Sequence, residues 1–273
     1  MLRKLAVLAA TAVLCVTSLV GCGSAASSSS ADKASDKDLL GRIQERGTMI
    51  VATEGDWAPW TYHDESGELT GYDVELAKEV AKKLGVEAEF QETVWDSILA
   101  GVDSGRFDVA FNGVDYTEER AKKYNFSDPY LYNFSVLVVK DDNDTIKTLE
   151  DLKGKKTANT ASSTYAGLAE EYGATVDPVD SLEQTIELVT TGRVDATINA
   201  QGSIEDYLSE HPDASIKIVS TFPGQPVVVP IRQGEDCESL KNAIDAAIAD
   251  LKKEGKLKEL SEKYFGTDLT ERQ

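Results

Sequence analysis

The sequence predicts an α/β protein of two similar lobes, each a mostly parallel sheet flanked by helices. Short apolar segments alternate with amphipathic ones along the chain, which is the β–α–β pattern typical of parallel sheets. A stretch of ten residues, 103–112, recurs at 190–199, each time after a similar amphipathic segment. The chain is 273 residues long, which is enough for about two domains.

The elements of the first half follow from local patterns. Residues 49–52 form an apolar run typical of a buried strand. Asp73 is expected to cap a helix whose apolar residues recur at helical spacing and which ends at Gly85. The other expected elements are a strand ending at Phe90, a helix from Trp95, and strands over residues 107–111 and 135–139.

The repeated segment predicts where a ligand would lie. Gly105 and Gly192 fit the left-handed position that ends the preceding helix, and strands then run to Asn112 and Asn199. Ligands of open α/β sheets bind beyond the carboxyl ends of the strands. Two lobes facing each other would therefore place Asn112 and Asn199 on opposite walls of one cleft. A chance likeness between two common helix–turn–strand units is the alternative.

The C-terminal segment completes the first lobe. Residues 239–265 are amphipathic and are expected to pack back on that lobe. The predicted division is residues 39–138 plus 230–267 for lobe I, 139–229 for lobe II and 268–273 for a tail.

The N-terminal segment predicts export and anchoring. Arg3 and Lys4 precede an apolar run over residues 5–20, as in a secretory signal over residues 1–21. The Leu-Val-Gly-Cys ending resembles a lipobox, which would leave Cys22 as a lipid-modified N-terminus; an ordinary signal with a chance cysteine is the alternative. The Ser-rich residues 22–38 are typical of a flexible tether. The expected location is extracytoplasmic, anchored to the cell membrane.

Composition excludes several classes of function. The chain has 48 acidic and 28 basic residues and a net charge of −20, which argues against nucleic acid as a partner. Cleavage of the signal would remove two positive charges, so −20 would become −22. Cys15, Cys22 and Cys237 cannot form a disulfide framework, and two histidines do not suggest a metal site. No catalytic or nucleotide-binding motif is found, so we expect a binding protein without a cofactor. We also expect it to be a monomer.

Three loops carry residues suited to binding. In the first, Trp57 suits a cleft wall, while Trp60 is as well explained as a core residue. In the second, Arg120 lies at a short helix capped by Thr117, where its guanidinium can hold a carboxylate; a surface pair with Asp128 or Glu119 is the alternative. In the third, residues 160–165 open a helix, where Ser162 or Ser163 gives either an anion site or a simple cap.

Several ordered motifs together resemble a known family. They are Gly-Glu-Leu-Thr-Gly-Tyr-Asp-Val (67–74), Trp-Asp (95–96), Thr-Glu-Glu-Arg (117–120), Phe-Ser-Asp-Pro-Tyr (126–130), Asp-Leu-Lys-Gly-Lys (151–155) and Leu-Ser-Glu-Lys-Tyr-Phe-Gly (260–266). Over residues 39–267 the chain resembles the family 3 extracellular solute-binding proteins, the polar amino-acid receptors of ABC importers. The resemblance implies a type II periplasmic-binding fold, whose lobes close on a free amino acid and present it to a membrane permease.

The resemblance also implies roles for particular residues. Arg120 would clamp the ligand α-carboxylate, helped by Ser163 or Thr164. The other implied ligand contacts are Trp57 and Trp95 on either side of the ligand side chain, Glu54 near its far end, and Asn112 and Gly113 at the rim of the first lobe. The Asn-Gly-Val-Asp run at 112–115 looks most like the cystine-binding branch.

One position departs from the family pattern. The family usually holds the ligand ammonium with an aspartate where this chain has Ala200. Asp115 is expected to take the ammonium instead, with a neutral hydrogen bond from Asn199 or Gln201; a ligand without a standard α-amino group is the alternative. A different class of function is a dehydratase acting on a prephenate or arogenate type of substrate, with Glu54 or Asp115 as general acid.

Overall fold

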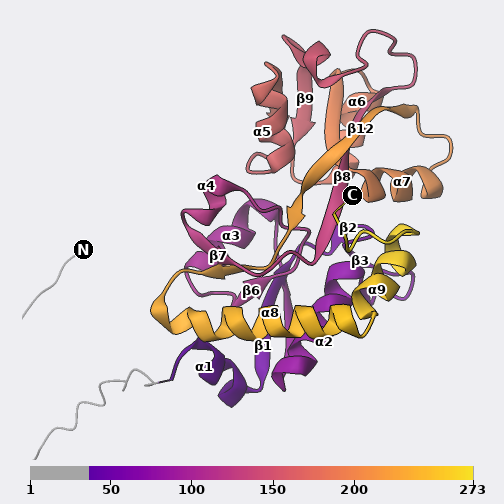
Figure 1. The fold of residues 1–273 in the computed structure, drawn as a ribbon. Coiled ribbons are helices and arrows are strands. Elements are labelled where there is room, and N and C mark those ends of the chain that lie inside the picture. Colours follow the sequence, from indigo (N-terminus) through magenta and orange to yellow (C-terminus); the bar gives the residue numbers. More distant parts are fainter. Residues whose placement is uncertain (1–36, 273) are drawn as a thin grey trace, which may run out of the picture. The chain divides into compact units, whose positions relative to one another are not determined.

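The computed structural model describes residues 37–272, so the predicted signal peptide, Cys22 and residues 22–36 of the predicted tether lie outside the described part, as does residue 273. Within residues 37–272 the elements form two lobes joined by two long strands (Figure 1). None of the helices in this range is long and apolar enough to cross a bilayer.

The first lobe contains the N-terminal elements and the C-terminal helices. Its elements are α1 (Leu39–Arg46), β1 (Thr48–Thr53), β2 (Asp56–Trp57), β3 (Thr61–His63), β4 (Leu69–Thr70), α2 (Tyr72–Leu84), β5 (Glu87–Glu92), α3 (Trp95–Asp103), β6 (Val109–Ala110), α4 (Glu118–Ala121) and β7 (Tyr124–Phe126), then β13 (Pro230–Arg232), η2 (Glu235–Cys237), α8 (Glu238–Lys253) and α9 (Lys256–Phe265). Its central sheet has the order β5-β1-β6, and all three strands are parallel.

The second lobe is built on a five-stranded sheet. Its elements are β8 (Leu131–Lys140), η1 (Leu149–Leu152), β9 (Lys156–Asn159), α5 (Thr164–Glu171), β10 (Thr175–Pro178), α6 (Leu182–Thr190), β11 (Ala196–Ala200), α7 (Gln201–Glu210) and β12 (Ile216–Val227). The strand order is β10-β9-β11-β8-β12; β10, β9 and β11 pair in parallel, whereas β8 pairs antiparallel with both β11 and β12. The predicted two-lobed α/β fold is confirmed. The second sheet also contains the long strands β8 and β12, which join it through antiparallel pairing.

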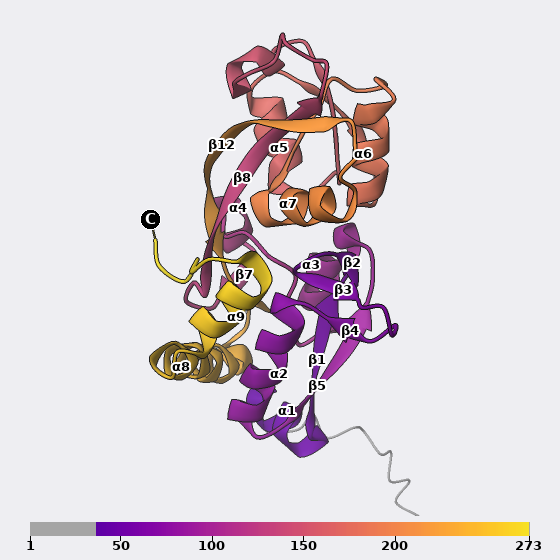
Figure 2. The same ribbon diagram turned by 90° about the vertical axis from the view of Figure 1, so that its right-hand side faces the viewer.

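The two lobes are connected by β8 and β12, which pair with each other from Lys140 and Ile216 to Leu131 and Val227. Figure 2 shows both strands running from one lobe to the other. The chain therefore passes between the lobes twice. The residues at which each lobe begins and ends stay a prediction.

The repeated segment has the same local structure in both lobes. Asp108 donates its backbone N–H to Ile50 O at 3.0 Å, and its carboxylate accepts the Ile50 N–H at 2.7 Å. Asp195 makes the equivalent pair with the N–H and C=O of Lys156, at 2.9 and 2.8 Å. Each aspartate thus joins the start of its own strand to the neighbouring parallel strand, which explains why Gly-Arg-x-Asp occurs twice.

The start of α2 differs from the prediction. Gly71, with φ 122°, is the N-cap, and Asp73 lies inside the first turn with no exposed surface. Glycine is needed at position 71 because a Cβ there would clash with the backbone carbonyl of Trp60. The Asp73 carboxylate points into the core, where it accepts hydrogen bonds from the Gly113 N–H and, at 2.9 Å, from the Tyr130 hydroxyl. Asp73 is therefore a core connector, not a helix cap.

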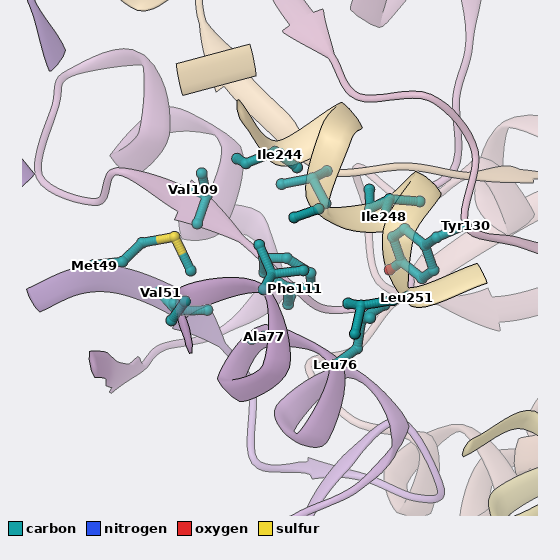
Figure 3. Packing of buried hydrophobic residues seen from close by; sticks show 14 of the residues in the cluster. Met49, Val51, Leu76, Ala77, Val109, Phe111, Tyr130, Ile244, Ile248 and Leu251 are labelled. Atoms are coloured by element: carbon teal, nitrogen blue, oxygen red, sulfur yellow. The ribbon is translucent and has the colours of Figure 1, made fainter. Parts of the chain in front are cut away.

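The largest core lies between the first sheet, α2 and α8. Figure 3 shows side chains of this core, most of them from the sheet, α2 and α8, with Phe111 and Tyr130 from the adjoining loops; its labelled residues are Met49, Val51, Leu76, Ala77, Val109, Phe111, Tyr130, Ile244, Ile248 and Leu251. The prediction that the C-terminal helix packs back on the first lobe is confirmed. Leu269, in the segment predicted as a tail, is buried against the same core, and its carbonyl accepts the Tyr132 N–H at 2.8 Å.

Cys237 belongs to this core as well. It is a free, buried cysteine between η2 and α8. Burial raises the pKa of its thiol to about 11, so the thiol stays protonated at neutral pH. A protonated, buried thiol acts as a small apolar group.

Candidate functional site

The strands of both sheets end at one cavity between the lobes. β1 and β6 lead into Glu54 and Gly113 of the first lobe; in the second lobe, β9 ends at Asn159, and Asn199 is the last residue but one of β11. The cavity has a free volume of about 60 Å³. Side chains beyond the carboxyl ends of parallel strands are the usual ligand contacts of α/β sheets, so this cavity is the candidate site.

The structure brings most of the predicted site residues together here. Those that line the cavity are Glu54, Trp57, Trp95, Gly113, Asp115, Arg120, Ser163, Thr164 and Asn199. Asn112 and Gln201 do not line it. Further lining residues outside the predicted set are Asp56, Asn159, Thr160, Tyr165, Asp180, Ser181, Leu182 and Thr185, of which Thr160 and Tyr165 belong to the predicted binding loop 160–165.

Arg120 is the one basic side chain that lines the cavity within residues 37–272. Its Nη1 donates to the Asp115 carbonyl at 2.9 Å and its Nη2 to the Ser162 carbonyl at 3.1 Å, so it touches both lobes. The guanidinium carbon lies 5.3 Å from the centre of the Trp95 ring. Thr117 caps α4 as predicted and accepts the Arg120 N–H at 3.1 Å. These contacts fix the guanidinium and leave further N–H donors for an anion.

The N-terminus of α5 adds a second anion-binding feature. Ser163 is the N-cap, as one of the two serines was predicted to be, and its Oγ accepts the Ala166 N–H at 3.1 Å. The first N–H groups of a helix have no acceptor within the helix and carry partial positive charge. Since Ser163 and Thr164 line the cavity beside Arg120, a carboxylate there would meet both a guanidinium and a helix N-terminus.

Asp115 is a buried carboxylate next to Arg120. It is 8% exposed and accepts a hydrogen bond from the Thr164 hydroxyl of the other lobe. Burial raises the pKa of Asp115 to about 6, although the Thr164 hydroxyl and the Arg120 charge oppose this. Arg120 and Asp115 together place opposite charges side by side, which suits a zwitterion.

Glu54 is held by Asn112 from behind the cavity wall. Asn112 Nδ2 donates to Glu54 Oε2 at 2.6 Å, and the Glu54 N–H donates to Asn112 Oδ1 at 2.8 Å. Asn112 has no exposed surface, and its Oδ1 also accepts from Thr53 and Thr61. Burial raises the pKa of Glu54 to about 7, and the Asn112 amide opposes the rise. Asn112 therefore positions Glu54 and does not reach the cavity.

The side chain of Gln201 bonds to a residue outside the cavity. Its Nε2 donates to Glu205 Oε1 at 2.6 Å along α7, and it does not line the cavity. Asn199 does line the cavity, but its Oδ1 accepts the N–H of Ala200 at 2.8 Å.

The three tryptophans divide between cavity and core. Trp57 and Trp95 line the cavity, whereas Trp60 has no exposed surface. The Trp57 ring stacks on Trp60 with centroids 5.3 Å apart and an interplanar angle of 10°. Gly113 allows this arrangement because its φ is +57° and a Cβ there would lie 2.6 Å from Trp57 Cζ3. A buried ring thus holds Trp57 in place as a flat wall.

The lobes touch each other beside the cavity. The Asp96 carboxylate of α3 accepts the Ser162 N–H at 3.1 Å and the Ser162 hydroxyl at 2.5 Å. Together with the bonds from Arg120 to Ser162 and from Thr164 to Asp115, these contacts hold the lobes together around the site. Despite several acidic side chains, no group of three or more His, Cys, Asp or Glu residues among residues 37–272 is arranged to hold a metal ion.

Comparison with known families agrees with this geometry. The family of bacterial extracellular solute-binding proteins, family 3, matches residues 49–267. The chain belongs to this family. A probable amino-acid ABC transporter-binding protein of Haemophilus influenzae is 41% identical over 86% of this chain and 91% of the relative. The L-cystine-binding protein TcyA of Bacillus subtilis is 39% identical over 98% of this chain and 99% of that protein.

A solved structure extends the comparison to the fold. An ancestral arginine-binding protein bound to arginine superposes with a TM-score of 0.75 at 39% identity, covering 81% of this chain and 99% of that one. The family membership thus rests on sequence and on structure alike.

Proposed function

We propose that this protein is an extracytoplasmic receptor that captures a polar amino acid between its lobes and delivers it to the permease of an ABC importer. The observation that carries the proposal is Arg120, a fixed guanidinium in a cavity where it is the one basic side chain within residues 37–272. A guanidinium held in this way binds a carboxylate through two parallel hydrogen bonds.

The head group of an amino acid fits the charges around Arg120. The α-carboxylate would contact the guanidinium and the free N–H groups at the start of α5, while the α-ammonium would pair with Asp115. Arg120 and Asp115 belong to the first lobe and α5 to the second, so a ligand that contacts all three favours the closed arrangement, in which Arg120 and Asp115 also contact Ser162 and Thr164. Closure removes these charges from water and strengthens their attraction.

L-cystine is the leading candidate ligand. Besides Asp115, the acidic side chains Glu54, Asp56 and Asp180 line the cavity and have no basic partner there within the described residues. A ligand with a second positive group suits this surplus; cystine carries a second ammonium at its far end, together with a second carboxylate. The relative TcyA, 39% identical over almost the whole chain, is named as an L-cystine-binding protein.

Anchoring and partners follow from the sequence and the family. The Leu-Val-Gly-Cys motif supports a lipid on Cys22, with residues 22–38 as the tether to the membrane. The Haemophilus influenzae relative is named as an ABC transporter-binding protein, which supports a permease as the partner. We propose that the receptor acts as a monomer, without a cofactor.

A calorimetric titration of the purified protein with the twenty amino acids and L-cystine tests the proposal. We expect one ligand per chain and the tightest binding with cystine or another polar amino acid. Binding of none of them would refute the amino-acid receptor. Prephenate and arogenate belong in the same experiment, because turnover of either would support the dehydratase in place of the receptor.

Asp115→Asn is expected to weaken cystine binding and to remove part of its pH dependence. An ammonium pairs with the ionised carboxylate, and the pKa of about 6 means that Asp115 is mostly protonated at pH 5. Binding must then expel a proton, so the Asp115 contribution should raise wild-type affinity about tenfold from pH 5 to pH 7, and this part of the rise should be absent in the variant; Glu54, with a pKa of about 7, titrates in both proteins. Calorimetry at pH 5, 6, 7 and 8 measures this. Equal affinity and an equal pH profile in wild type and variant would show that Asp115 does not hold the ammonium.

A further inference from the structure

Asn159 lies at the carboxyl end of β9, between the ends of β10 and β11. It is only 2% exposed, yet it lines the cavity. A side chain at this place faces the ligand site from the second lobe, opposite Asp115 of the first.

The orientation of the Asn159 amide is fixed by one hydrogen bond. Its Nδ2 donates to the Ile198 carbonyl at 2.7 Å. Because a carbonyl oxygen only accepts, the amide cannot be turned round without placing two oxygens together. Its Oδ1 consequently points away from Ile198, and no donor within residues 37–272 reaches it.

A buried acceptor without a donor is unfavourable, and native proteins rarely keep one without a reason. No residue among 37–272 supplies this donor, and because Asn159 lines the cavity, a ligand bound there is the group placed to supply it. The neighbouring amides are engaged differently, since Asn199 Oδ1 already accepts the Ala200 N–H, and Gln201 donates to Glu205 and does not line the cavity.

We propose that Asn159 Oδ1 accepts a hydrogen bond from the α-ammonium of the ligand. The ammonium would then lie between a charged acceptor of the first lobe, Asp115, and a neutral acceptor of the second, Asn159. This rests on the proposed function, and it makes Asn159 a residue that selects for a free amino group. It also links ligand to closure, because the ammonium reaches both acceptors only when the lobes are together.

Asn159→Leu tests the proposal, with L-cystine as the first probe and L-arginine measured in parallel. Leucine has a similar volume and no acceptor, so we expect at least a tenfold loss of affinity in calorimetry. Thr157→Val is the matched control, because Thr157 lies on the same strand, is fully buried and has an unpartnered hydroxyl, but does not line the cavity. It should bind as wild type does.

The outcomes separate this inference from the proposed function. If the wild type binds an amino acid and Asn159→Leu binds it within twofold, the role of Asn159 is refuted and the receptor stands. If no amino acid binds the wild type, both the role of Asn159 and the amino-acid receptor are refuted. Should Asn159→Leu fail to fold, a crystal structure of the wild-type complex decides. A ligand nitrogen within hydrogen-bonding distance of Asn159 Oδ1 supports the proposal, and a protein donor or a water molecule in that place overturns it.

Discussion

Arg120→Ala is expected to lower the affinity for any α-amino acid by about 100-fold or more. The variant loses the two charge-assisted hydrogen bonds to the ligand carboxylate, each of which contributes about 1.5–3 kcal/mol. Arg120→Lys keeps the charge but loses the planar fork and the contact with Trp95, so its loss should be smaller, about tenfold. Calorimetric titration with the wild-type ligand measures both.

Arg106→Ala is the control for this experiment. Arg106 is an exposed arginine whose guanidinium lies over the Phe107 ring, and it does not line the cavity. It should bind as the wild type does. If Arg120→Ala remained folded, as judged by its melting curve, and still bound the ligand normally, the carboxylate site would have to lie elsewhere.

Asp73→Ala is expected to lower the free energy of unfolding by about 2–5 kcal/mol. The change leaves the Gly113 N–H and the Tyr130 hydroxyl without an acceptor in the core and opens a small void. Because Gly113 lines the cavity, ligand affinity should fall as well. Urea unfolding followed by circular dichroism measures the stability.

Tyr130→Phe gives the comparison, since it removes one of the two hydrogen bonds and leaves Asp73 in place. Its free energy of unfolding should fall by about 1 kcal/mol.

The pH dependence of stability tests the Asp73 carboxyl group separately. Burial raises the pKa of Asp73 to about 7, so the folded protein keeps a proton that the unfolded chain releases between about pH 4 and pH 7. This contribution to wild-type stability is present at pH 4 and lost as pH rises. The free energy of unfolding of the wild type should therefore exceed that of Asp73→Ala by less at pH 8 than at pH 5. The same difference at both pH values would contradict a raised pKa of Asp73.

Local signals explain why much of the fold could be predicted. Thr117 and Ser163 begin helices because their side chains accept N–H groups of the first turn; Thr117 was predicted from the sequence, and Ser163 was one of two serines predicted for its cap. Gly105 and Gly192 have φ of +73° and +70°, each one residue beyond the C-cap of its helix, α3 or α6. Such features depend on a few neighbouring residues. They can be read without knowing what packs against them.

Two of the missed site residues share one cause. Asp180 and Ser181 follow β10, a strand of four residues that ends in a proline and carries little pattern of its own. Once β10 is known to pair with β9, the rule that ligands bind at the carboxyl ends of parallel strands points to both residues. The rule can be applied from sequence only where the strand itself is predicted, and β10 was not.

By itself the sequence determined the α/β class, the repeated lobe, the family and the cluster around Arg120. It determined these because each depends on periodicity or on residues close together in the chain. Only the tertiary structure decided which polar atoms remain free for a ligand. Asn112 and Asn199 hold equivalent places in the repeat, yet Asn112 is buried behind Glu54 while Asn199 lines the cavity. Asn159 has an unpaired acceptor because its amide is fixed by a carbonyl 39 residues away. Hydrogen-bond partners of this kind come from distant segments, so they are settled only when the chain has folded.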